Sequence, residues 1–207
     1  MRRFAVSAER PEPAAIAAAV EVLRDGGVVA FPTDTLYGLA VDPRNGGAVE
    51  RLFALKGRDR NVAVPLVASD LEQAALAGEL GARERRVADA FWPGPLSVVI
   101  PARPAIARGL LGGGSTVAIR VPSHAVAREL AAAFGFCVTA TSANAAGQPP
   151  AASANAVAVA LPDVDLLLDG GNVPGGAPST IVAFDTDGPV LLRAGVVAWD
   201  RVIKSLQ

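Results

Sequence analysis

Histidine and cysteine are almost absent from this chain of 207 residues, which contains one of each, His124 and Cys137. A single cysteine cannot form an internal disulfide. A zinc site needs three or four such ligands, and a Cys–His catalytic pair needs both residues together, so neither kind of site is expected. Cys137 lies between Phe136 and Val138 in an expected buried strand, which favours a packing role. His124 stands at an expected helix start, where capping or surface exposure is the ordinary role.

Long hydrophobic runs are absent as well. No stretch of about 18 uncharged apolar residues occurs, as a transmembrane helix would require. Arg2-Arg3 is not followed by an apolar segment of signal-peptide length. Apolar residues make up 51% of the chain, but alanine inflates that share. These features predict a cytoplasmic protein with no membrane partner.

An excess of positive charge is also missing. The chain has 19 basic and 20 acidic residues, for a net charge of −1. A protein that only binds nucleic acid nonspecifically would usually be basic. The local cluster Arg83-Glu84-Arg85-Arg86 is interpreted as a solvated helix face. The composition therefore argues against a role limited to RNA binding.

Lysine is the scarce cation, because Lys56 and Lys204 are the only two among the 19 basic residues. Lys204 lies near the C-terminus, where a solvated charge needs no special explanation. Lys56 follows an amphipathic stretch and begins the motif Lys56-Gly57-Arg58. A lysine kept here in an arginine-rich chain indicates a site that needs a compact point charge with three donors. Phosphate is the commonest target of such a group.

Strand and helix patterns alternate irregularly along the chain. Proline at position 13 and Gly26-Gly27 past the end predict a helix over residues 13–24. Further helices are expected at residues 47–55, 71–77, 83–91, 124–134 and 198–206, with a short one after the loop at 147–150. Strands are expected at residues 4–6, 28–31, 64–68, 96–100, 117–121, 136–140, 166–168, 180–184 and 190–192. With no composition shift or long linker, this predicts one α/β or α+β domain over residues 1–207 on a largely mixed sheet.

Polar side chains gather at the ends of the expected strands, where ligands usually meet open sheets. The set comprises Thr33, Asp34, Thr35, Thr116, Arg120, Thr139, Thr141, Ser142, Asn144, Ser179, Thr180 and Arg193. Each residue alone is weak evidence for a ligand site, because residues of these types commonly cap helices and form turns. Together with Lys56 and Arg58 they suit an anionic, oxygen-rich ligand such as a nucleotide. No nucleophile–base pair accompanies them, so catalysis by positioning and charge neutralisation is expected.

Familiar phosphate-binding loops do not occur. There is no Walker A sequence and no G-x-G-x-x-G after a strand, so Gly112-Gly113-Gly114 and Gly175-Gly176 are expected to form flexible loops. The only tyrosine, Tyr37, could stack on a ligand or pack inside the protein, and the sequence leaves both open.

Several motifs, in order along the chain, resemble those of one family. They are Pro32-Thr33-Asp34-Thr35-Leu36-Tyr37-Gly38-Leu39, Lys56-Gly57-Arg58, Phe91-Trp92-Pro93-Gly94-Pro95-Leu96, Ala118-Ile119-Arg120-Val121-Pro122, Thr141-Ser142-Ala143-Asn144 and Ser179-Thr180-Ile181. The family is the YrdC-like threonylcarbamoyl-AMP synthases, and the resemblance extends from about residue 14 to residue 197. It implies a twisted, mixed α/β sheet with helices around a deep, positively lined cavity, in the short, single-domain form.

The resemblance also implies a nucleotidyltransferase reaction. L-Threonine, bicarbonate and ATP, with Mg²⁺ accompanying the ATP, would give threonylcarbamoyl-AMP and pyrophosphate. The product would supply N6-threonylcarbamoyladenosine in tRNA through separate threonylcarbamoyl-transfer proteins. Members are also described as able to bind double-stranded RNA, so tRNA or double-stranded RNA is an expected partner.

The implied residue roles follow the motifs. Lys56 and Arg58 would be catalytic and would neutralise the triphosphate. Thr116, Ser142, Asn144 and Arg193 would complete the ATP site. Thr35, Arg120 and Ser179 would bind threonine, with Arg120 pairing bidentately with its carboxylate. No protein metal ligand is implied. After Arg58 the chain departs from the pattern of many relatives, which leaves Arg60 and Asn61 as candidates for a further phosphate contact.

Two other functions are weighed against the synthase. The same domain occurs in hydrogenase-maturation carbamoyltransferases, but those carry an acylphosphatase-like domain and Cys-rich zinc motifs, and this chain has one cysteine. A non-catalytic, double-stranded-RNA-binding or ribosome-associated protein would need a basic surface, against which the net charge of −1 counts.

Overall fold

Two mixed β-sheets form the framework of the protein, whose computed structural model describes residues 1–207. Sheet A has the strand order β1-β9-β2-β3-β8 and sheet B the order β11-β10-β5-β6-β4-β7. The strands are β1 (Arg2–Ala5), β2 (Val29–Phe31), β3 (Gly38–Ala40), β4 (Leu66–Val67), β5 (Leu96–Pro101), β6 (Thr116–Arg120), β7 (Val138–Thr139), β8 (Thr141–Ser142), β9 (Leu166–Asp169), β10 (Thr180–Phe184) and β11 (Pro189–Arg193). The predicted mixed α/β class is confirmed, with the strands divided between two sheets.

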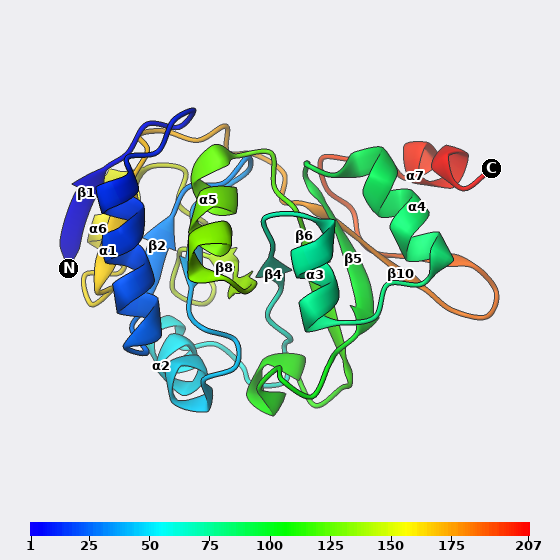
Figure 1. Ribbon diagram of the computed structural model, residues 1–207, viewed down its shortest axis with the longest axis horizontal. Helices are drawn as coiled ribbons and strands as arrows, with labels where there is room; N and C mark the ends of the chain where they lie inside the picture. Colours follow the sequence, from blue (N-terminus) through cyan, green and yellow to red (C-terminus); the bar gives the residue numbers. More distant parts are fainter.

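The helices pack around these sheets, α1 beside α5 and α4 beside α7 (Figure 1). They are α1 (Pro13–Arg24), α2 (Gly46–Lys56), α3 (Leu71–Ala77), α4 (Ala82–Phe91), α5 (Ala125–Phe134), α6 (Ala154–Ala160) and α7 (Trp199–Ser205), with a 3₁₀ helix η1 (Arg108–Leu111). None of them combines the length and the hydrophobicity that a membrane crossing requires.

Local patterns placed most elements correctly and missed the shortest ones. Helices α1 and α3 begin and end at the predicted residues, 13–24 and 71–77. Strands β3 and β8 and the helix η1 were not predicted. β3 starts at Gly38 inside the polar turn motif, and β8 has two residues, so neither has a periodicity of its own. They form because Gly38 pairs with Phe31 on one side and with Ser142 on the other.

The chain passes directly from sheet B to sheet A at Ala140. β7 ends at Thr139 and β8 begins at Thr141. The fully buried Thr139 hydroxyl donates to the Leu39 carbonyl (3.0 Å) and accepts from the Val41 amide (2.9 Å). This pair of bonds holds β3 of sheet A against β7 of sheet B and fixes the junction between the sheets.

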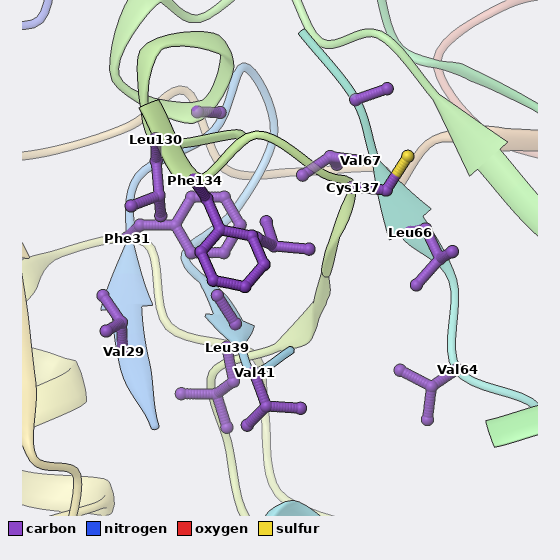
Figure 2. Close-up of a cluster of buried hydrophobic side chains, with 14 of the residues drawn as sticks. Val29, Phe31, Leu39, Val41, Val64, Leu66, Val67, Leu130, Phe134 and Cys137 are labelled. Carbon is purple, nitrogen blue, oxygen red and sulfur yellow. The ribbon is translucent and has the colours of Figure 1, made fainter. Parts of the chain in front are cut away.

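One buried cluster of 56 residues extends through both sheets, so they share a core. Figure 2 shows part of it, with Phe31 of β2, Leu39 of β3 and Phe134 of α5 toward the left and Leu66 and Val67 of β4 toward the right. Cys137 belongs to this cluster and is fully buried, which confirms the predicted packing role. Burial raises the pKa of its thiol to about 12, so the thiol stays protonated and unreactive at neutral pH.

Candidate functional site

The polar strand ends meet in one pocket of about 210 Å³, lined from both sheets. Figure 1 shows β8 and β4 lying between β2 and β6. Ala140, where the chain passes from sheet B to sheet A, also lines the pocket. The lining includes six of the nine predicted site residues, namely Thr35, Arg58, Arg120, Ser142, Ser179 and Arg193. Thr33, Tyr37, Ser97 and Thr141 are also part of it.

Three guanidinium groups and no carboxylate line this pocket. Arg58 Nη1 donates to the Thr141 hydroxyl (3.2 Å), while Arg193 Nε and Nη2 donate to the Ser179 carbonyl (3.0 and 2.8 Å). Burial lowers the pKa of Arg193, and the positive charges of Arg120 and Arg58 lower it further. The three cations therefore repel one another across a shared space, which a bound anion would relieve.

Arg58 reaches the pocket because α2 ends at Lys56, two residues before it. Asn45 caps the start of α2 by accepting the Ala48 amide at 3.2 Å. Gly57 ends the helix in the left-handed conformation, φ 59°, which glycine adopts without the strain a side chain would impose. The Lys56-Gly57-Arg58 motif is therefore a helix end that turns Arg58 away from the helix axis.

Arg120 is buried and already held by protein partners. Its Nη1 lies 2.8 Å from Asp34 Oδ1, in an ion pair whose side chains are 8% and 10% exposed. Nη2 donates to the hydroxyls of Thr33 (3.2 Å) and Thr35 (3.4 Å). Nε has no protein partner, and it is not sealed from solvent. The edge formed by Nε and Nη2 is the one that can receive a ligand carboxylate.

Asp34 orients this guanidinium, and its own carboxylate is fixed in turn. Oδ2 accepts from the backbone amide and the hydroxyl of Ser123, both at 3.1 Å. The shared network fixes which edge of Arg120 faces the pocket.

Asp34→Asn should lower the free energy of unfolding by about 3 kcal/mol, because it leaves the buried Arg120 charge unpaired. Asp42→Asn is the matched control, since it breaks the Asp42–Arg44 pair (2.9 Å) at the surface, where the arginine side chain is 43% exposed. That change should cost less than about 1 kcal/mol. Urea denaturation of the two variants measures both values, and equal losses would show that Asp34 is not a buried counter-charge.

Ser97 is a pocket residue that sequence reasoning missed. Its hydroxyl lies 3.1 Å from that of Ser179, and Ser179 Oγ accepts from Arg193 Nη2 at 2.9 Å. Ser97 is 1% exposed, so its hydroxyl can bond only to neighbours or to a ligand in the pocket. The sequence feature that could have indicated Ser97 is its hydroxyl, the only one in the otherwise apolar strand expected at residues 96–100.

Lys56 lies behind the pocket wall and not among the lining residues. Its ammonium donates to the carbonyls of Ser142 (2.5 Å) and Asn144 (2.6 Å), and Asn144 Oδ1 is 3.5 Å away. The residue is 4% exposed, and burial, together with the Arg58 charge, lowers the pKa of the ammonium to about 8. Lys56 and Asn144 thus support the segment that presents Ser142 to the pocket.

The remaining candidates lie outside the pocket. Thr116 is exposed at the start of β6, four residues before Arg120, which places it about 13 Å along the strand. Arg60 is exposed and forms an ion pair with Glu50, and Asn61 is exposed as well. Strand ends alone could not separate Thr116 from the others, because it lies at the opposite end of β6.

Tyr37 packs inside the wall and anchors a glycine-rich segment. Its ring is fully buried, and its hydroxyl donates to the Gly171 carbonyl (2.8 Å) and accepts from the Gly170 amide (3.1 Å). The Gly175 amide donates to the Thr35 carbonyl at 2.9 Å. This segment continues to Gly176, which lines the pocket. The loop at Gly175-Gly176, expected from the sequence to be flexible, is therefore held by hydrogen bonds at Gly175 itself and at Gly170-Gly171.

The lowered pKa of Lys56 predicts opposite pH trends for activity and stability. As pH rises through about 8 the ammonium loses its charge, so anion binding and turnover should fall. Between about 8 and 10.5 the unfolded chain binds more protons at Lys56 than the folded chain, so this group makes stability rise with pH. Lys56→Arg removes this titration. The ratio of wild-type to variant activity should therefore decline above pH 8, and a flat ratio would contradict the assignment.

The chain is similar to known proteins along nearly its whole length. The Sua5/yciO/yrdC family model, described as telomere recombination, matches residues 21–195. A threonylcarbamoyl-AMP synthase of Pyrococcus abyssi is 36% identical over 198 residues, covering 95% of this chain and 58% of that protein. One of Chromohalobacter salexigens is 43% identical over 169 residues, covering 80% of this chain and 90% of that protein.

The fold has a solved counterpart. The crystal structure of Pyrococcus abyssi Sua5 complexed with L-threonine superposes with a TM-score of 0.94 at 34% identity, covering 99% of this chain and 61% of that one. The present chain therefore spans about three fifths of the Pyrococcus protein.

Proposed function

The chain belongs to the Sua5/YciO/YrdC family, and from this premise we propose that it is a threonylcarbamoyl-AMP synthase. It would be a nucleotidyltransferase that condenses L-threonine, bicarbonate and ATP. One observation carries the proposal, namely three guanidinium groups in a hydroxyl-lined pocket without a single carboxylate. Such a pocket suits several anionic groups at once, and the substrates are a carboxylate, a bicarbonate and a triphosphate.

Threonine would bind at the Arg120 end of the pocket. Its carboxylate would take the Nε–Nη2 edge of Arg120, of which Nε has no protein partner, and the hydroxyls of Thr35 and Ser179 would hold its polar groups. Supporting this, these side chains line one pocket, with Arg120 fixed by its bond to Asp34 and Ser179 by its bond to Arg193. The Pyrococcus relative, whose crystal structure contains L-threonine, is 34% identical to this chain over the superposed region.

ATP would bind toward Arg58, Ser142 and Arg193. Arg58 and Arg193 would neutralise phosphate oxygens, while Lys56 would hold the Ser142–Asn144 backbone and add positive charge from behind the wall. Magnesium would enter with ATP as part of the substrate. The pocket lining contains no carboxylate, which fits an ion held by phosphate oxygens and water.

The chemistry needs no protein base. The threonine amine and bicarbonate form a carbamate with loss of water, and that carbamate is already anionic. One of its oxygens attacks the α-phosphorus, the bond from the α-phosphorus to the β-phosphate oxygen breaks, and pyrophosphate leaves with the electron pair. The protein's part is to align the carbamate with the α-phosphate and to stabilise the charge that develops on the phosphate oxygens.

The product would pass to separate threonylcarbamoyl-transfer proteins that modify adenosine in tRNA. We therefore propose a cytoplasmic enzyme with tRNA, or double-stranded RNA, as a further partner.

Pyrophosphate release from ATP by the purified protein tests the proposal. Release should require both L-threonine and bicarbonate, and omission of either should return the rate to background. L-Serine and L-valine serve as matched substrates, since each lacks one feature of threonine. A folded protein that releases no pyrophosphate with all three substrates would contradict the synthase and favour the RNA-binding alternative.

A further inference from the structure

A second cavity, of about 330 Å³, lies on the helical side of sheet B. Its walls come from the start of α3, the end of α4, the segment after β6 and the side of α5 (Figure 1). The lining residues are Ser69, Asp70, Leu71, Ala88, Asp89, Trp92, Pro93, Val121 and Arg128. None of these lines the proposed synthase pocket.

Opposite charges face this cavity without neutralising each other. Arg128 uses only Nη1, which donates to the Pro122 carbonyl at 2.8 Å, so its Nε and Nη2 are free. Asp89 is exposed and makes no hydrogen bond or ion pair with the protein, and it forms no ion pair with Arg128. Asp70 is the second carboxylate, but it already accepts from the Gln73 amide (2.7 Å) and the Ser69 hydroxyl (2.8 Å).

The rest of the wall is apolar and includes one aromatic ring. Leu71, Ala88 and Val121 supply aliphatic surface. Trp92 is held in place because its indole nitrogen donates to the Leu96 carbonyl at 2.7 Å. A free cation, a free anion and an apolar wall therefore meet in one cavity.

We propose that this cavity binds a small zwitterion of the α-amino-acid class. Its carboxylate would pair with Arg128, its ammonium with Asp89, and its apolar side chain would lie against Trp92. A simple anion would meet two carboxylates and a single arginine here, and a simple cation would leave Arg128 without a partner. A zwitterion satisfies both charges at once.

The two sites are joined by a short run of chain. Val121, in this cavity, directly follows Arg120. The next residue, Pro122, accepts from Arg128, and Ser123 donates to Asp34, the partner of Arg120. An occupant on Arg128 would thus act on the segment that positions Arg120. If the proposed synthase function holds, occupancy should change threonine affinity, and threonine should change the occupant's affinity by the same factor.

Binding can be tested without any activity. The chain has two tryptophans, Trp92 and Trp199, so Trp199→Phe leaves Trp92 as the sole fluorescent reporter beside the cavity. Titration with L-leucine should give a saturable change in Trp92 emission. L-Leucinamide, which lacks the carboxylate, and 4-methylpentanoate, which lacks the ammonium, should each bind at least tenfold more weakly. No saturable change with L-leucine, or equal binding of either analogue, would overturn the proposal.

Variants locate the site. In the same background, Arg128→Gln and Asp89→Asn should each raise the Kd for L-leucine at least tenfold. Glu129→Gln, at the next position of α5, should leave it unchanged, because Glu129 lines a different groove, shared with α1. Should Arg128→Gln fold poorly through loss of its bond to Pro122, Asp89→Asn still decides, since Asp89 has no protein partner.

Discussion

Replacing Arg120 by lysine should weaken L-threonine binding about a hundredfold while changing ATP binding much less. Lysine keeps a positive charge against Asp34, so the buried carboxylate is not left unpaired. It loses the planar fork, however, and with it the Nε–Nη2 edge that can take a carboxylate through two parallel bonds. Loss of about 3 kcal/mol from a charge-assisted bidentate contact corresponds to a factor of about a hundred. Titration calorimetry with L-threonine and with a non-hydrolysable ATP analogue measures both affinities.

Arg193→Lys is the matched control for this experiment. Arg193 also lines the pocket, but it bonds to Ser179 and not to Asp34, and it is less buried than Arg120. Its replacement should weaken ATP binding more than threonine binding. A larger effect of Arg120→Lys on ATP than on threonine would overturn the assignment of Arg120. Parallel losses for both ligands in both variants would show one undivided anion site.

The sequence predicted what depends on local pattern. The proline start and the glycine end of α1 and the apolar strands of both sheets depend on adjacent residues, and the structure has them at or within a few residues of the predicted positions. The convergence of Thr35, Arg120 and Arg193 was also predictable. Strand ends that carry polar side chains commonly meet at one edge of a sheet.

What could not be predicted depends on contacts between distant residues. β8 exists because Ser142 pairs with Gly38, and neither partner has a strand pattern of its own. The scarcity of lysine and the Lys56-Gly57-Arg58 motif placed Lys56 in the site, but could not place it behind the wall, because its partners are backbone carbonyls, which every residue has. Thr116 failed to join the pocket for a simpler reason, since the side-chain type at a strand end does not say which end faces the ligand.

Lys56→Met should both destabilise the protein and slow pyrophosphate release. Methionine retains most of the apolar stem but none of the three donors. The Asn144 carbonyl, now bonded at 2.6 Å, would lose its partner inside the protein, and the Ser142 carbonyl, now bonded at 2.5 Å, would keep only the Asn144 amide at 3.0 Å. Leaving one buried acceptor unsatisfied should lower the free energy of unfolding by about 1–3 kcal/mol. The loss of a fixed positive charge behind the phosphate site should reduce pyrophosphate release about a hundredfold or more.

Lys204→Met is the natural control, because it removes the only other lysine, which is exposed on α7. It should change stability by less than about 0.5 kcal/mol and leave turnover unaltered. Urea denaturation and pyrophosphate release, measured on the same preparations, separate the two effects of Lys56. A Lys56→Met protein that is destabilised but turns over at the wild-type rate would reduce Lys56 to a support for the Ser142–Asn144 segment. A stable but inactive one would mean that its charge acts on the phosphates and that the two carbonyls find other donors.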